Sequence, residues 1–121
     1  MMRAIVVNQS QGVVLAASAE IADNWWTRGR GLLGRRFLAD GSGLILTPCR
    51  GVHSFGMRTP FDAIYVGRGR VLAVVAPFLP NRFGPIVRDT EWILEVPAGT
   101  VCRTGTSVGH VIERVAVGAA G

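Results

Sequence analysis

Short apolar segments alternate along this chain with turns rich in glycine, proline and asparagine. Most of the segments are rich in β-branched side chains and bounded by turn residues, which is typical of β-strands. Residues 91–96 alternate charged and apolar side chains, as in a strand with one face in solvent. The predicted strands cover residues 3–7, 13–17, 44–47, 52–57, 62–66, 70–78, 91–96 and 111–117. The pattern predicts a mainly β fold of about seven to nine strands, a compact antiparallel β-sandwich or a partly closed barrel, with α+β as the alternative.

The hydrophobic period changes to that of a helix between residues 20 and 34. Ile21, Trp25 and Leu32 recur at helical spacing, so they would form one apolar face. We expect this short helix in the N-terminal region to pack these three side chains onto the sheet. Gly34 is expected to end it, because glycine lowers helix stability by about 1 kcal/mol relative to alanine.

Length and composition favour a single domain that spans residues 1–121. A chain of 121 residues, 49% of them hydrophobic, is long enough to bury its own core. The sequence shows no secretory segment and no apolar run of the roughly 18 residues that a membrane span needs. We therefore expect a soluble, cytoplasmic protein in which Cys49 and Cys102 are reduced thiols.

The charge of the chain is basic and comes entirely from arginine. Thirteen basic residues, none of them lysine, outweigh eight acidic ones and give a net charge of +5. A basic balance is compatible with a polyanion partner, but the exclusive use of arginine is more typical of codon bias. Trp25, Trp26 and the arginines between Arg28 and Arg36 interleave aromatic and basic side chains, which makes nucleic-acid binding a second alternative function.

The chemically densest stretch is CRGVHSFGMRTPFDAIYV, residues 49–66. It contains one of the two cysteines, one of the two histidines and the only tyrosine. His53, Met57, Arg58 and Asp62 are the candidate ligand-binding residues within it. Polar side chains gather here without the signature of a reaction. The leading hypothesis is therefore a non-catalytic accessory module that binds a small ligand or a protein partner.

The segment from residue 77 to 90 is the longest irregular piece of the sequence and contains Pro77, Pro80, Gly84 and Pro85. Long irregular connections often carry ligand-facing loops, so we expect this one to border the candidate surface. A pocket lined by the candidate residues would favour a small ligand. An exposed apolar patch would favour a protein partner.

An enzyme is the first alternative function. Cys49 with His53 or His110 and an acid such as Asp62 would supply nucleophile, base and orienting group for a hydrolase or transferase. Cys49, His53 and Met57 are also soft metal ligands, but their four-residue spacing separates neighbours by about 13 Å on an extended chain. The sequence assigns no catalytic residue, metal or cofactor.

Asp62 follows Pro60 at the start of a predicted strand. Proline lacks an N–H and restricts Thr59 to extended conformations, so the chain should bend just before Asp62. We expect the Asp62 carboxylate to accept backbone N–H groups at this bend or to pair with Arg58. Asp62 would then have a structural role first.

Four stretches resemble the signature of domain-of-unknown-function family 192. They are HSFGMRTPFD at residues 53–62, RGLLGR at 30–35, WILEVPAG at 92–99 and the late Gly109. The resemblance implies a single compact domain, mainly β with a short helix near its start. It implies no activity, because the function of the family is not established. The family usually has Asp directly after the late glycine, where this chain has His110.

Overall fold

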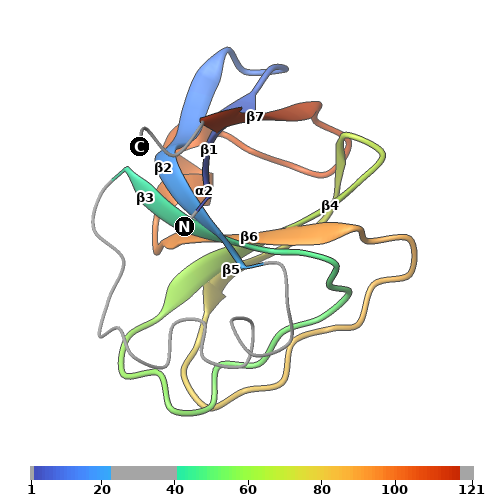
Figure 1. Cartoon of the computed structure of the whole chain (residues 1–121). Helices are drawn as coiled ribbons and strands as arrows, with labels where there is room; N and C mark the ends of the chain where they lie inside the picture. Colours follow the sequence, from blue (N-terminus) through green and yellow to red (C-terminus); the bar gives the residue numbers. More distant parts are fainter. Residues whose placement is uncertain (1, 23–40, 118–121) are drawn as a thin grey trace.

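The structure of the protein, a computed structural model, describes residues 2–22 and 41–117. Seven strands and one short helix follow one another in these residues (Figure 1). The strands are β1 (Arg3–Asn8), β2 (Val13–Ala22), β3 (Ser42–Leu46), β4 (Phe61–Gly67), β5 (Arg70–Phe78), β6 (Trp92–Pro97) and β7 (Ile112–Val117), and the helix is α2 (Thr100–Thr104).

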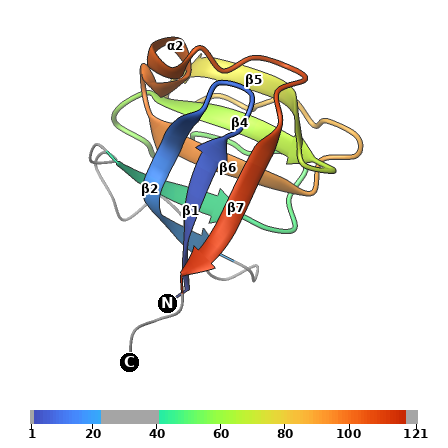
Figure 2. The ribbon, with the colours of Figure 1, turned by 90° about the horizontal axis from the view of Figure 1, so that it is seen from above.

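The seven strands form one sheet, in the order β5-β4-β6-β3-β2-β1-β7. Neighbours are antiparallel except β2 and β3, which are parallel. The sheet curls, so that β2, β1 and β7 cross over β4, β5 and β6 (Figure 2). Its two edges meet at one end, where Ile112 donates its N–H to Gly69 O at 2.8 Å and Val71 to His110 O at 2.9 Å. The predicted mainly β fold is confirmed, and the curled sheet is a half-barrel.

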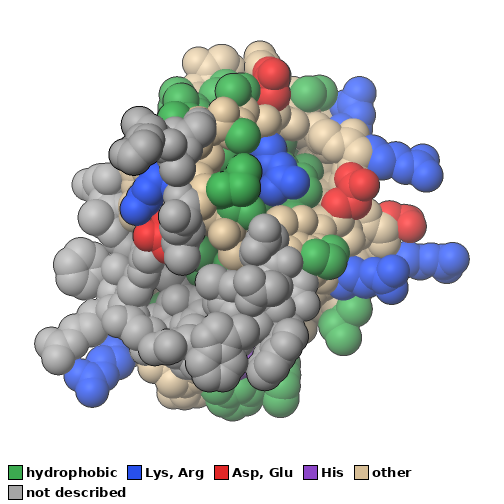
Figure 3. Space-filling view, viewed as in Figure 1, with side chains coloured by type: hydrophobic (Ala, Val, Ile, Leu, Met, Phe, Trp, Pro, Cys, Tyr) green, Lys and Arg blue, Asp and Glu red, His purple; other side chains and the backbone are tan. Residues whose placement is uncertain are grey.

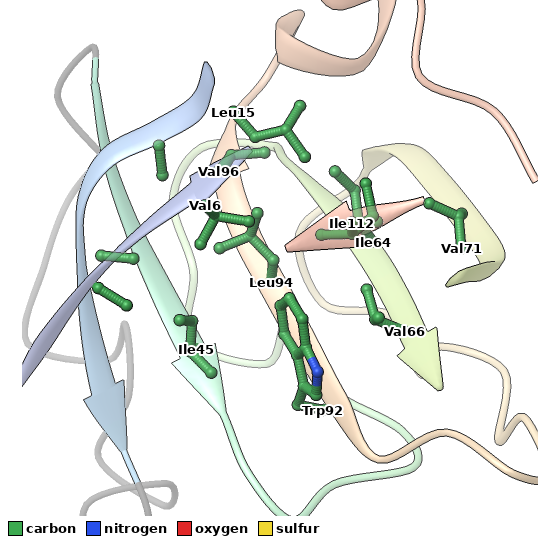
Figure 4. Close-up of a cluster of buried hydrophobic side chains, with 13 residues drawn as sticks. Val6, Leu15, Ile45, Ile64, Val66, Val71, Trp92, Leu94, Val96 and Ile112 are labelled. Atoms are coloured by element: carbon green, nitrogen blue, oxygen red, sulfur yellow. The ribbon is translucent and has the colours of Figure 1, made fainter. Parts of the chain in front are cut away.

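An inner cluster of apolar side chains fills the hollow of the curled sheet. Strand β6 points Trp92, Leu94 and Val96 into it, because successive side chains of a strand face opposite sides. Figure 4 shows these side chains meeting residues of β1, β2, β4 and β7. The buried members are Ala4, Val6, Leu15, Ala16, Ala19, Ile45, Ile64, Val66, Val71, Trp92, Leu94, Val96 and Ile112.

An outer cluster lies on the opposite face of β3, β4 and β6. All residues of β4 are buried, so this strand is covered on both faces. Part of the cover comes from Val52, Met57 and Val87, which lie in the loops before β4 and after β5. The buried members of the outer cluster are Ala22, Leu44, Leu46, Met57, Phe61, Ala63, Tyr65, Phe78 and Ile93. These two loops are therefore part of the packing of the protein.

The strand predicted at residues 52–57 is wrong. Within it only His53 forms a β-bridge, with Phe83, and the chain then turns as Met57 donates its N–H to Ser54 O at 3.1 Å. Gly56 has a positive φ of 86°, which an extended strand does not allow. The composition favoured a strand, but the backbone of this segment bonds to another loop instead of a neighbouring strand.

The second strand is longer than the pattern predicts, because residues 18–22 pair with β3 in parallel. Residues 20–22 are therefore strand, which contradicts the start of the helix predicted at residues 20–34. The remainder of that prediction lies outside the described residues. Helix α2, which the pattern does not predict, is bracketed by Gly99 and Gly105, both with positive φ.

A polar network around His110 joins β1 to the turn before β7. The buried Asn8 amide donates to Thr106 Oγ1 at 3.0 Å and to His110 Nδ1 at 3.2 Å. Ser107 also donates its N–H to His110 Nδ1, at 3.2 Å. Both groups are donors only, so Nδ1 is the ring nitrogen that accepts. An aspartate carboxylate, which the resemblance implies at this position, would accept the same two N–H groups.

We therefore expect His110→Asp to be nearly as stable as the wild type. His110→Ala removes the acceptor for two N–H groups and should lower the free energy of unfolding by ~1 kcal/mol. Urea denaturation of the two variants side by side measures the difference. Equal losses for both variants would show that the accepting nitrogen of His110 contributes nothing to this turn.

Candidate functional site

The four residues predicted to bind a ligand do not lie in one cluster. Met57 is 7% exposed and packs in the outer cluster. Asp62 is 1% exposed and pairs with Val96 on the inner face of the sheet. His53 and Arg58 are exposed on the loop before β4. The structure thus separates two buried residues from two surface residues.

The two surface residues belong to a pair of loops, residues 50–58 and 79–88, that are bonded to each other. Ser54 donates its N–H to Arg82 O at 2.9 Å, and Gly84 donates its N–H to Val52 O at 2.9 Å. The buried Ser54 hydroxyl accepts the N–H of Arg82 at 2.9 Å and donates to Leu79 O. These bonds hold the paired loops together as one unit.

The paired loops are also fixed to the sheet. Tyr65, fully buried on β4, donates its hydroxyl to Pro85 O at 2.8 Å. Gly84 lies directly on the ring of Phe78, where a Cβ would come within 2.6 Å of the ring. Only glycine fits this approach, so the chain between residues 83 and 86 is held tightly against β5.

Four large apolar side chains of the paired loops nevertheless face solvent. Phe83 is 81% exposed and Ile86 is 82% exposed, while Leu79 and Phe55 are about half exposed. The Phe55 and Phe83 rings meet edge to face with centroids 4.7 Å apart. We call Phe55, Leu79, Phe83 and Ile86 the tip patch. Figure 3 shows hydrophobic side chains at the lower end of the molecule, where these loops run in Figure 1.

The charged residues of the paired loops all have one sign. The paired loops contain Arg50, Arg58, Arg82 and Arg88 and no acidic residue. All four arginines are exposed. The surface that results combines protruding apolar side chains with positive charge.

Asp62, in contrast, has a structural role on the inner face of the sheet, near the start of β4. Its Oδ2 accepts the N–H of Gly99 at 3.1 Å and of Val101 at 2.9 Å, so it holds the turn that begins α2. Its Oδ1 is buried and has no hydrogen-bond partner in the part of the chain that the structure describes. Burial raises the pKa of the carboxyl, although the backbone bonds act in the opposite direction. The sequence predicts backbone donors at the bend before β4, with Arg58 as the alternative partner, whereas the observed donors are Gly99 and Val101.

We expect Asp62→Ala to lower the free energy of unfolding by about 1–3 kcal/mol, because two backbone N–H groups lose their buried acceptor. Asp62→Asn keeps one acceptor oxygen and should lose less. His53→Ala should melt like the wild type, since His53 is exposed. Thermal melts of the three variants provide the test. An unchanged melting temperature for Asp62→Ala would contradict the structural role and make this carboxylate a candidate functional group again.

Glu95 is a buried acid that the sequence analysis does not single out. The strand pattern predicted one face of this segment in solvent, but Glu95 is 4% exposed and faces the outer cluster opposite Ala63 and Leu44. Burial raises the pKa of Glu95 to about 8. Burial, the neighbouring Cys49 and Glu95 together raise the pKa of Tyr65 to about 12. The signal that could have identified Glu95 is a single acidic residue within a strand that is covered on both faces.

A carboxyl whose pKa is raised in the folded protein contributes stability below its unfolded pKa, and this contribution is lost as pH rises through the folded value. For Glu95 the loss runs from pH 4.5 to about 8. We expect Glu95→Gln to be more stable than wild type at pH 8, on the order of 2–4 kcal/mol, and to match it near pH 4.5. Urea titrations at both pH values measure this, with the exposed Glu113→Gln as control. A difference in stability between Glu95→Gln and the wild type that does not change with pH would contradict the raised pKa of Glu95.

The cysteine-histidine arrangement of the enzyme hypothesis is not assembled in the described residues. The Cys49 thiol donates to Gly51 O at 3.0 Å. His53 Nδ1 accepts the N–H of Phe55, and the ring of His110 bonds to Asn8 and neighbouring polar groups. Neither histidine bonds to a cysteine in residues 2–22 and 41–117. The same part of the chain holds no group of three His, Cys, Asp or Glu side chains suited to a metal.

No helix of the described residues is long and apolar enough to cross a membrane.

The fold and this surface define a β half-barrel that displays an apolar and basic loop pair. The chain belongs to the family described as DUF192, Uncharacterized ACR, whose sequence model matches residues 6–114. The resemblance carried by the four motifs is thereby confirmed. No curated protein is significantly similar to the chain in sequence.

Two solved structures are similar to this chain in fold. A protein of unknown function from Novosphingobium aromaticivorans has a TM-score of 0.77 at 25% identity, over 92% of this chain and 83% of that one. A protein from Sinorhizobium meliloti has a TM-score of 0.76 at 26% identity, over 93% of this chain and 92% of that one. The latter is described as a "putative transcription regulator".

Proposed function

We propose that the protein is a non-catalytic binding module that holds a protein partner with its tip patch. The observation that carries the proposal is the display of Phe83 and Ile86, each more than four-fifths exposed, on loops that are bonded to each other and to the sheet. Large exposed apolar patches on soluble proteins mark interaction surfaces.

The energetics of the loops support this function. Leaving a large apolar side chain in water instead of burying it forgoes about 1.5–3 kcal/mol. A mobile loop could recover part of this by folding such side chains inward, but Ser54 and Tyr65 fix the paired loops to each other and to β4. The exposed conformation is therefore set before binding, which lowers the entropy cost of association.

The charge of the loops indicates the chemistry of the partner. Arg58 and Arg82 are exposed on the two loops that carry the patch, and the loops have no acid. A complementary partner has an apolar pocket for aromatic and aliphatic side chains, with acidic groups at its rim. Aromatic residues and arginine are the side chains most enriched at the centres of protein interfaces.

A second copy of the chain is a poorer partner. A two-fold symmetric contact through the tip patch would bring the same arginines of both copies together. With a net charge of +5 on each chain, this contact would be repulsive. Charge complementarity therefore favours an acidic protein of a different kind.

The test compares the double variant Phe83→Ser/Ile86→Ser with Val108→Ser, which removes a 64% exposed valine outside the patch. Both variants should stay folded, since exposed positions usually change stability by about 0.5 kcal/mol or less. The wild type and both variants are immobilised, and a protein that the wild type retains but the double variant does not is purified. Calorimetry then measures the Kd of this partner for the wild type and for each variant. We expect the double variant to weaken binding at least ~30-fold and Val108→Ser to leave it unchanged.

Three outcomes would contradict the proposal. In the first, sedimentation shows self-association of the wild type that the double variant loses. In the second, the patch binds vesicles with anionic lipids instead of a protein. In the third, Val108→Ser weakens binding of the partner as much as the double variant does. Loss of binding by the double variant alone, with weaker wild-type binding at high salt, supports an acidic protein partner.

Two further hypotheses have less support. The hydrolase or transferase lacks an assembled cysteine-histidine pair in the described residues. Nucleic-acid binding through residues 28–36 involves a segment outside them, and what favours it is the net charge together with the description of the Sinorhizobium protein.

A further inference from the structure

A groove with a different chemistry lies beside the sheet, between the chain before β6, the β4–β5 turn and β7. It consists of two hollows of about 760 and 500 Å³. Arg50, Thr90 and Glu91 line both hollows, so the two are neighbours. Sites for small molecules commonly have volumes of about 300–1,000 Å³, which makes this space large enough for a ligand.

Close backbone packing builds the groove. Gly67 at the end of β4 lies against Asp89, where a Cβ would come within 2.2 Å of the Asp89 carbonyl oxygen. Glu91 donates its N–H to Val66 O at 2.9 Å and accepts the N–H of Cys49 at 3.2 Å. The Glu91 carboxylate accepts the backbone N–H of Arg68 at 2.6 Å. These contacts place three segments of the chain side by side, each of which carries arginine.

The four guanidinium groups of the groove have unused donors. Arg50, Arg68, Arg88 and Arg114 line it, and none of their side chains has a hydrogen-bond or ion-pair partner among the described residues. Arg114 lies over the ring of Trp92 at 4.9 Å from its centroid, a cation–π contact. Burial lowers the pKa of Arg114, opposed by the charge of Glu91. We call these four residues the arginine groove.

The charge balance of the groove favours an anion. Four arginines stand against Asp89 and Glu91, and the Glu91 carboxylate already accepts a backbone N–H. Thr90 lines both hollows, and its hydroxyl is buried without a hydrogen-bond partner among residues 2–22 and 41–117. Figure 3 shows arginine side chains gathered with a few acidic ones along the right-hand side of the molecule.

We propose that the arginine groove binds a small molecule that carries phosphate groups. Guanidinium groups match phosphate oxygens with two parallel hydrogen bonds, and Arg50, Arg68 and Arg88 line the same hollow. The guanidinium of Arg114, which lies over Trp92 in the adjoining hollow, offers a plane on which an aromatic base stacks. A nucleotide uses both hollows, whereas an inorganic polyphosphate uses only the first.

Calorimetric titration of the wild type with ATP and with tripolyphosphate tests the proposal. The titrations are made in about 150 mM NaCl, because salt at this concentration screens diffuse charge attraction. We expect both probes to bind, with ATP the tighter. Arg88→Ala, which removes an exposed side chain, should weaken both ~10-fold or more, because a charged hydrogen bond is lost. Arg114→Lys should remove the preference for ATP, since an ammonium group offers no flat surface.

Arg103→Ala is the matched control, because it removes one exposed arginine from α2, whose side chain lines neither hollow. It should bind both probes like the wild type. Equal weakening by Arg103→Ala and Arg88→Ala would show diffuse charge attraction and overturn the proposal. Absence of binding to either probe, or binding only of a single-stranded oligonucleotide, would overturn it as well. Equal affinity for ATP and tripolyphosphate would retain the phosphate site and reject the stacking of a base on Arg114.

Discussion

The fold depends on the burial of β4 and β6 from both sides. Their inward side chains build the inner cluster against β1, β2 and β7, and their outward side chains need a second cover. Part of that cover comes from Val52, Met57 and Val87 of the paired loops. The loops that display the tip patch are therefore also part of the core, which explains how flat apolar side chains such as Phe83 can be held in solvent without the loop collapsing.

The sequence was sufficient for the elements whose pairing is local or whose composition is strongly β. Strand β5 has the bounds that the pattern predicts, and β4 and β6 differ from their predicted bounds by one residue at each end. The prediction failed at residues 52–57, where a β-like composition serves to bury Met57 and to bond a loop, and at residues 20–22, whose partner β3 is distant in sequence. Long-range pairing overrides local period in both places.

The candidate site was predictable only in part, for the same reason. Local chemistry located the right stretch and the right loop, but it could not say that Asp62 would reach Gly99 or that Glu95 would lie in an apolar cluster. These two carboxyls come from neighbouring strands, where Ala63 pairs with Glu95, yet they face opposite sides of the sheet. One receives two N–H donors and the other receives its pKa shift from burial alone. The environment of each carboxyl, and not its residue type, therefore makes Asp62 a structural acid and Glu95 an acid that destabilises the folded protein at neutral pH.

The tip patch and the arginine groove share one stretch of backbone. Phe83 and Ile86 belong to the patch, and Arg88 and Thr90 line the groove. Between them Val87 donates its N–H to Arg50 O at 3.0 Å. Charges act over about 8 Å at physiological salt, so phosphates bound at Arg50 and Arg88 would cancel part of the positive potential beside the patch. An acidic partner would then meet a weaker attraction. Because such coupling is reciprocal, a partner bound at the patch would disfavour the anion to the same degree, and the two ligands would compete without touching.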